Sequence, residues 1–294
     1  MFTLNDYCRK TFGQKLYKIS LNGGMTCPNR DGTCGSRGCI FCSEGGSGDF
    51  TPDLSMSIER QIETAKSRVS GKFRGKRYIA YFQAYTNTYA PVEYLRNLFI
   101  PVIKRDDIAV LSIATRPDCL GEEVISLLSY LNSIKPVWVE LGLQTSNRRT
   151  SEYIRRGYDL EVYERTVKRL NNIGVHIITH VILGLPGETR DDMLCSVRYA
   201  VKTGTGGIKL QLLHVLENTD LADDYRQGKF KVLTLEEYSD IVTECVKNIP
   251  DDVVIHRLTG DGPKKILIAP LWSADKKRVL NEINRKIRLM ESAK

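Results

Sequence analysis

Several features are missing from this 294-residue sequence, and each absence narrows the class of protein. No apolar run approaches the roughly 18 residues that a membrane-spanning helix requires. The N-terminus lacks the basic and then apolar order of a secretory signal peptide, so we expect a cytoplasmic protein. Internal repeats and low-complexity segments are also lacking, which leaves one folded domain with small terminal additions as the expectation.

The composition allows a substantial core, because 41% of the side chains are apolar and single α/β-barrel domains reach this length. The formal net charge of +8 is compatible with a polyanionic partner. Residues 66–77 hold six basic residues and no acid, and residues 276–294 hold seven basic residues against Glu282 and Glu291. These two stretches are either solvated charged faces or a footprint for nucleic-acid phosphates.

Short runs typical of β-strands alternate with longer segments of helical period. The strand candidates are Tyr17 to Leu21, Arg77 to Gln83, Ile108 to Thr115, Val137 to Leu143, His176 to Leu183 and Gly207 to Leu213. The helix candidates are Ser55 to Ser70, Pro91 to Ile103, Gly121 to Leu131, Leu160 to Ile173 and Thr189 to Lys202. This alternation predicts βαβ units with a parallel sheet, and six units predict an α/β fold with a partial (β/α)6 TIM-like barrel.

The pattern becomes helical toward the C-terminus, at Leu235 to Asn248 and Ala274 to Met290. We therefore expect residues 1–215 to form the barrel core. Residues 216–294 are expected to form a C-terminal extension that packs on the barrel and contacts the substrate.

One face of several predicted strands is polar. Glu140 and Gln144 alternate with apolar residues along Val137 to Gln144, and His180 and Lys209 occupy similar positions on later strands. A barrel filled by branched side chains does not direct such groups inward, because unpaired buried polar groups are costly. The pattern predicts a wet, substrate-holding lumen. The alternative is an open sheet with this face in solvent, although parallel sheets are normally covered on both faces.

The eight cysteines are unevenly distributed. Since the chain lacks a secretion signal, its thiols are expected to stay reduced, and metal or redox chemistry is their expected use. Four of them, Cys27, Cys34, Cys39 and Cys42, crowd one segment, whereas Cys8, Cys119, Cys195 and Cys245 are scattered and are expected to be ordinary buried side chains.

The crowded segment, residues 23–48, reads GGMTCPNRDGTCGSRGCIFCSEGGSG. Its glycines permit the backbone to approach an inorganic cluster closely, and thiolates are the ligands of iron–sulfur clusters. Cys39 and Cys42 form a C-x2-C pair, with Cys27 upstream. Three ligands leave one iron of a four-iron cluster open to a chelating molecule. A zinc site with four sulfur ligands is the alternative, because Cys34 completes the count, although a second C-x2-C pair is lacking.

With these residues in view, the chain resembles the radical S-adenosylmethionine (SAM) superfamily, in the branch that includes the catalytic subunit of Elongator. The resemblance is closest to a bacterial family that includes the tRNA-modifying enzyme MnmL and the protein YhcC, and it spans nearly the whole chain. The segments that carry it are TCPNRDGT, CIFC, ATRPDCL, ELGLQT, GLPGET and TGDGP.

The resemblance implies a 4Fe–4S cluster and SAM as cofactors. Cys27, Cys39 and Cys42 would be the metal ligands and the catalytic centre. Cys34 departs from the family pattern and could compete with Cys27, but the surrounding CPNRDG favours Cys27. The implied SAM-binding residues are Phe41 beside the adenine, Ile182 and Gly184 at the nucleoside, Glu140 and Gln144 at the ribose or methionine part, and Arg156 at the methionyl carboxylate.

The residues expected near the substrate are Gln83, Thr115, Arg116, His180, Lys209 and Asp261. His180 replaces a glycine of the usual family pattern, and a lone strand histidine is more often a hydrogen-bonded lumen residue than a catalyst. Asp261 is either a substrate contact or a turn former.

The resemblance also implies an activity. One electron from the cluster would split SAM into methionine and a 5'-deoxyadenosyl radical, which removes hydrogen from the substrate. The implied partners are tRNA, whose wobble uridine would be processed from the carboxymethylaminomethyl toward the aminomethyl form, and an electron donor such as flavodoxin or ferredoxin. Four tyrosines either stack on flipped-out bases or belong to the core, namely Tyr78, Tyr81, Tyr85 and Tyr89.

Two other functions stay open at this point. One is a radical SAM enzyme that acts on a peptide or a small metabolite, with the basic stretches serving only solubility. The other is a zinc-stabilised RNA-binding protein without catalysis. Salt-dependent tRNA binding separates the first of these from a tRNA-modifying enzyme, and metal analysis separates the second.

Overall fold

The computed structural model describes residues 1–294 except 47, 50, 72, 74 and 293–294. Lys72, Arg74 and Lys294 of the two basic stretches therefore lie outside the described residues. A seven-stranded parallel sheet has the order β1-β2-β3-β4-β5-β6-β8. Its strands are β1 Tyr17–Leu21, β2 Tyr78–Phe82, β3 Ile108–Thr115, β4 Val137–Gln144, β5 His176–Leu183, β6 Gly207–Leu212 and β8 Val254–Arg257.

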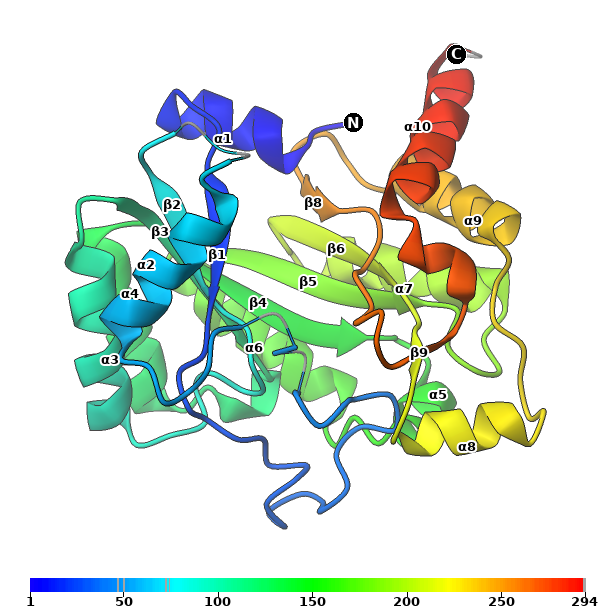
Figure 1. Ribbon diagram of the computed structural model, residues 1–294, viewed down its shortest axis with the longest axis horizontal. Helices are drawn as coiled ribbons and strands as arrows, with labels where there is room; N and C mark the ends of the chain where they lie inside the picture. Colours follow the sequence, from blue (N-terminus) through cyan, green and yellow to red (C-terminus); the bar gives the residue numbers. More distant parts are fainter. Residues whose placement is uncertain (47, 50, 72, 74, 293–294) are drawn as a thin grey trace.

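Helices pack around the curled sheet, most of them on its outer face (Figure 1). They are α1 Leu4–Phe12, α2 Ile58–Val69, α3 Val92–Lys104, α4 Glu122–Ile134, α5 Arg148–Tyr153, α6 Leu160–Asn172, α7 Arg190–Lys202, α8 Asp220–Arg226, α9 Leu235–Lys247 and α10 Lys276–Ser292. A small antiparallel pair joins β7 Val215–Leu216 to β9 Leu267–Ala269. None of the helices in the described part of the chain is long and apolar enough to cross a bilayer.

The partial barrel is confirmed, and the six predicted strands are β1 to β6. The prediction missed the seventh strand, β8, which pairs in parallel with β6. β8 is only four residues long and ends in His256 and Arg257, so its sequence lacks the apolar run that marked the others. The prediction from the sequence also missed the short helices α1, α5 and α8. The proposed boundary near residue 215 stays a prediction, while β8 brings a residue range beyond that boundary into the main sheet.

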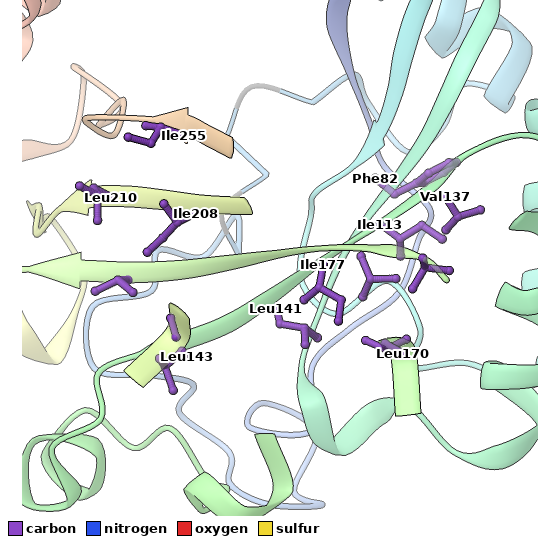
Figure 2. Packing of buried hydrophobic residues seen from close by; sticks show 14 of the residues in the cluster. Phe82, Ile113, Val137, Leu141, Leu143, Leu170, Ile177, Ile208, Leu210 and Ile255 are labelled. Atoms are coloured by element: carbon purple, nitrogen blue, oxygen red, sulfur yellow. The ribbon is translucent and has the colours of Figure 1, made fainter. Parts of the chain in front are cut away.

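The hydrophobic core lies between the sheet and its outer helices (Figure 2). Val137, Val139, Leu141 and Leu143 form the apolar face of β4 and are at most 1% exposed. They belong to the same buried cluster as Leu170 of α6 and the apolar side chains of the other helices. Because this face packs outward, the alternate residues of β4 point into the barrel.

The amino ends of the strands are closed by an aromatic plug. Tyr7 of α1 stacks on His176 with ring centroids 5.3 Å apart and meets Trp138 edge-on at 5.8 Å. His176 Nε2 lies 3.2 Å from His256 Nε2. Figure 1 shows α1 across this end, whereas the loop after β1 projects beyond the opposite end. The interior is therefore reached from the carboxyl ends of the strands.

Candidate active site

A cavity of about 290 Å³ lies inside the barrel toward the carboxyl ends of the strands. The loop after β1, the strand ends and the segment around residues 257–263 line it. The predicted site residues found in its wall are Cys27, Cys39, Phe41, Cys42, Gln83, Thr115, Arg116, Glu140, Gln144, Arg156, His180, Ile182, Lys209 and Asp261. The structure thus brings together residues that are far apart in the sequence.

Gly184 is the predicted residue that does not line this cavity. It has a φ of 89°, and a Cβ there would lie 3.0 Å from the Leu233 side chain. Its amide donates to the sulfur of Met193. Gly184 therefore shapes the turn after β5, and its predicted contact with the nucleoside stays a prediction.

The cysteine loop is fixed by its own backbone and by two polar side chains. The amide of Cys42 donates to the carbonyl of Cys39 at 3.0 Å, which forms the turn of the C-x2-C pair. Arg30 donates to the carbonyls of Cys42 at 3.0 Å and Ser43 at 2.6 Å. Asn29 donates to Cys39 Sγ at 3.4 Å and to the Arg155 carbonyl at 2.7 Å. These bonds hold the thiols against the barrel mouth.

The three thiols have the chemistry required of cluster ligands. All eight cysteines are free, and Cys27, Cys39 and Cys42 line one cavity. Burial raises the pKa of Cys39 to about 12, and burial also raises that of Cys42, so neither is a thiolate without a compensating cation. Bound iron would supply that positive charge. The donor set fits a 4Fe–4S cluster held by three cysteines. Within the described residues, no three His, Cys, Asp or Glu side chains are grouped as a ready site for a metal ion.

Cys34 lies elsewhere. It is exposed and lines a neighbouring hollow together with Asn29, Arg37 and Arg155. Its amide donates to the Pro28 carbonyl at 2.7 Å, which turns this part of the loop away from the cavity. Cys27 therefore fits the third ligand position better than Cys34, and a four-sulfur zinc site would need the loop to rearrange.

A ring of polar side chains, one from each strand of the main sheet, crosses the barrel interior. We call this set the lumen belt: Lys18, Tyr81, Ser112, Glu140, His180, Lys209 and Arg257. Glu140 is its centre, with 1% of its surface exposed. Its carboxylate accepts from Lys18 at 2.6 Å, Ser112 at 2.7 Å and His180 at 2.7 Å, and also from Lys209. The prediction of a polar lumen is confirmed.

The charges of the belt follow from these contacts. Burial opposes ionisation of Glu140, but Lys18 and Lys209 more than offset it, and its pKa lies well below the usual value. Burial lowers the pKa of His180 to about 4, so the ring is neutral at pH 7. A neutral ring that donates from Nε2 to Glu140 accepts at Nδ1 from Gln211, 3.1 Å away. His180 is therefore a hydrogen-bonded lumen residue, as expected.

Two residues predicted to hold SAM already form hydrogen bonds with other groups of the protein. Glu140 has its oxygens engaged by the belt, and Arg156 donates to the carbonyls of Leu143 at 3.0 Å and Thr145 at 2.7 Å. Gln144 differs, because its buried Oε1 has no hydrogen-bond partner within the described residues, and its φ of 65° holds it at the end of β4. Gln144 is thus free to accept from a ligand hydroxyl, while the SAM contacts of all three residues stay predictions.

The residues expected near the substrate line the cavity, and several of their side chains have protein partners. Thr115 Oγ1 lies 2.5 Å from Thr88 Oγ1, and Arg116 pairs with Asp118 at 2.7 Å. Asp261 accepts from Arg257 at 3.3 Å and from Lys276 at 2.6 Å. Asp261 is therefore part of a charged network at the cavity rim and does more than form a turn.

The two alternatives for the tyrosines, stacking on bases or belonging to the core, divide between the four residues. Tyr78 is 8% exposed and packs in the hydrophobic core, whereas Tyr81 is 7% exposed and lines the cavity as part of the lumen belt. Their strand positions on β2 explain this, because both faces of β2 are buried. Tyr85 lines the cavity, and Tyr89 is half-buried with its hydroxyl 2.8 Å from Thr33 Oγ1.

Sequence reasoning missed three functional candidates. Lys18 and Arg257 belong to the lumen belt, and His214 lines the cavity with a buried Nε2 that has no partner within the described residues. A signal existed for His214, because it lies two residues after the end of β6, and residues at the carboxyl ends of barrel strands are those that reach a site.

Comparisons with known proteins match most of the chain. The profile of the Radical SAM superfamily matches residues 31–200, and that of the Radical_SAM C-terminal domain matches residues 205–288. The uncharacterized protein YtqA of Bacillus subtilis is 43% identical over 97% of this chain and 88% of its own length. Protein YhcC of Escherichia coli is 37% identical over 94% of this chain and 88% of its own length.

More distant matches point to a second group. A tRNA uridine(34) acetyltransferase of Methanocaldococcus jannaschii is 27% identical over 54% of this chain and 29% of its own length. The solved structure of the archaeal Methanocaldococcus infernus Elp3 superposes with a TM-score of 0.68 at 17% identity, over 95% of this chain and 63% of that one. The latter similarity concerns the fold.

Proposed function

The chain belongs to the radical SAM superfamily, in the Elongator-like branch, and from this premise we propose that it is an enzyme that cleaves SAM reductively and modifies the wobble uridine of tRNA. Cys27, Cys39 and Cys42 would hold the 4Fe–4S cluster. When bound, the reduced cluster supplies the electron that splits SAM into methionine and a 5'-deoxyadenosyl radical. The proposed change takes a carboxymethylaminomethyl side chain toward the aminomethyl form.

One observation carries this proposal. The cavity lined by the three cysteines is also lined by Lys209 of the lumen belt, so a cofactor at the loop and a substrate group in the lumen would share one chamber. Radical transfer requires such proximity, because the reacting atoms must come within about 3–3.5 Å. Enclosure by the barrel also keeps water away from a reactive intermediate.

The chain's own residues would position the two reactants. Gln144 offers an unpartnered acceptor to a ribose hydroxyl, and the cavity-lining face of Phe41 offers an apolar surface for adenine. Arg116 and Arg156 both lie over the Tyr158 ring, at 5.0 and 4.8 Å from its centroid. These three side chains form a rigid wall between the loop and β4.

Two features support tRNA as the substrate class. A relative acts on tRNA uridine 34 by name. Beside α9, a surface hollow of about 690 Å³ is lined by three exposed cations of α10, Lys277, Arg278 and Arg285. Glu236, Asp275 and Glu282 line the same hollow, and Glu282 pairs with Arg285 at 2.7 Å. The exposed cations of α10 suit the sugar–phosphate backbone of an RNA.

The test is anaerobic incubation of the reconstituted protein with SAM, dithionite and bulk tRNA from a strain that lacks this gene. We expect 5'-deoxyadenosine to form, and nucleoside mass spectrometry to show conversion at the wobble uridine. Formation of 5'-deoxyadenosine with no change in any tRNA nucleoside would reject the tRNA substrate and favour a peptide or a small metabolite.

A further inference from the structure

The lumen belt and its neighbours hold more positive than negative charge. Glu140 is the shared partner of Lys18 and Lys209. Asp261 is the shared partner of Arg257 and Lys276. Two carboxylates therefore serve four basic side chains, and the neutral His180 ring adds no charge of its own. Burial lowers the pKa of Lys209 well below its usual value, while Glu140 beside it favours the charged form of the amine.

The Glu140 part of this set lies where water screens charge poorly, whereas the side chains of Arg257 and Lys276 are 37% and 44% exposed. Lys209 is 5% exposed and Glu140 is 1% exposed. The ammonium groups of Lys18 and Lys209 lie 4.3 and 4.5 Å from the centroid of the Tyr81 ring, so even the aromatic face of Tyr81 is used to offset positive charge. Burying an unmatched cation is costly, and such a cost is recovered when an anion enters.

Two of these cations face the cavity. Lys209 and Arg257 both line it, from neighbouring positions on β6 and β8. Gln211 and His214 line the same side, and the buried Nε2 of His214 has no partner within the described residues. Together they form a polar wall with hydrogen-bond capacity toward a ligand.

The shape of the lumen decides which kind of anion reaches this wall. The plug of Tyr7, His176 and His256 closes the amino ends of the strands, so a ligand enters from the carboxyl ends. Only the end of the ligand that enters first, its leading end, reaches the wall of the lumen. A backbone phosphate of an RNA is flanked by two sugars and is never a leading end. A carboxylate at the tip of a side chain is a leading end, and its two oxygens match the planar guanidinium group of an arginine.

We propose that Lys209 and Arg257 form a carboxylate-binding site that receives the acidic tip of the substrate's side chain and so selects substrate over product. This inference rests on the proposed function, because the carboxymethylaminomethyl side chain of the wobble uridine ends in a carboxylate and the aminomethyl product does not. Formation of the aminomethyl product breaks the bond between the side-chain nitrogen and the carboxymethyl carbon, so the carboxylate leaves on a separate two-carbon fragment and the tRNA product keeps no anion in the site.

The test compares two tRNAs that differ only in the wobble side chain, carboxymethylaminomethyl or aminomethyl, for binding to the reconstituted holoenzyme. We expect the wild-type protein to prefer the carboxylate form by on the order of tenfold, the scale of one charge-assisted hydrogen bond. Arg257→Gln should remove most of this preference by weakening only the carboxylate form, and Arg257→Lys should restore part of it. Arg165→Gln, an exposed position on α6, is the control and should keep the wild-type ratio.

Each other outcome contradicts the inference. Equal weakening of both tRNAs by Arg257→Gln would assign the site to an RNA phosphate, and weaker binding of SAM would assign it to the methionyl carboxylate. Equal affinity of the wild-type protein for the two tRNAs rejects it without any variant. Failure to bind either tRNA rejects the proposed substrate itself, an outcome distinct from the loss of discrimination.

Discussion

At the scale of single residues, the account depends on which thiols hold iron. Cys27, Cys39 and Cys42 line one cavity, and Cys34 lies in the hollow beside it. The sequence alone left Cys27 and Cys34 in competition, because both are close to the C-x2-C pair. The loop's hydrogen bonds, which no spacing rule encodes, separate them in space.

The first prediction concerns this pair of thiols. Cys27→Ala should abolish the broad visible absorbance of the reconstituted protein and its SAM cleavage, because the cluster loses a ligand. Cys34→Ala is the matched control from the same loop and should retain both. Iron analysis and 5'-deoxyadenosine measurement check it, and the reverse result would move the third ligand to Cys34.

Buried histidines give the second prediction. Burial lowers the pKa of His176 to about 4, whereas an unfolded histidine titrates near 6.5. The unfolded state then binds more protons between these two values, so stability should be full above about pH 6.5 and decline as the pH falls toward 4, by up to about 3 kcal/mol for this group. Urea unfolding of wild type and His176→Gln across this range measures it. A variant with the same pH dependence as wild type would contradict it.

At the scale of elements, the strands could be predicted from the sequence, but only part of the lumen belt could. Alternating polar residues on β4 and β5 marked Glu140 and His180 as interior groups. Lys18 and Arg257 escaped notice, because the Lys18–Glu140 contact joins residues 122 positions apart and β8 is too short to show a period. Such contacts depend on the closure of the sheet, and local pattern carries no information about it.

The cysteine loop provides the third prediction. Gly38 has a φ of 73°, and an added Cβ would lie 3.1 Å from Arg30 Nε, the side chain that holds the Cys42 carbonyl. Gly38→Ala should therefore displace Arg30 and lower cluster occupancy. Gly32→Ala is the control, since Gly32 has a φ of 93° with open space around it and suffers only the backbone strain of about 1 kcal/mol. Iron content per chain compares the two, and equal loss would exclude a role for Arg30.

At the scale of the whole molecule, the fold places a closed end, a charged interior and an open mouth along one axis. The aromatic plug under α1 seals one end, and the cysteine loop borders the other (Figure 1). The family resemblance anticipated the barrel, and its three cysteine ligands stay a prediction. It did not anticipate the charge surplus of the lumen, which arises from side chains on strands that meet only after folding.

The basic face of α10 gives the fourth prediction. Replacing Lys277, Arg278 and Arg285 with glutamine should weaken tRNA binding and reduce the slope of log affinity against log salt by about 2, because fewer counterions are released. A triple glutamine variant of Arg149, Arg165 and Lys168, exposed on α5 and α6, is the control. Titrations at several salt concentrations measure the slope. An unchanged slope would remove α10 from the RNA-binding surface.

The most direct test of the central claim is SAM cleavage by anaerobically reconstituted protein under dithionite. The account predicts that wild type forms 5'-deoxyadenosine and methionine, and that the triple variant Cys27→Ala, Cys39→Ala, Cys42→Ala forms neither. Undiminished cleavage by the triple variant would contradict it, since no open iron could then be held by these three sulfurs.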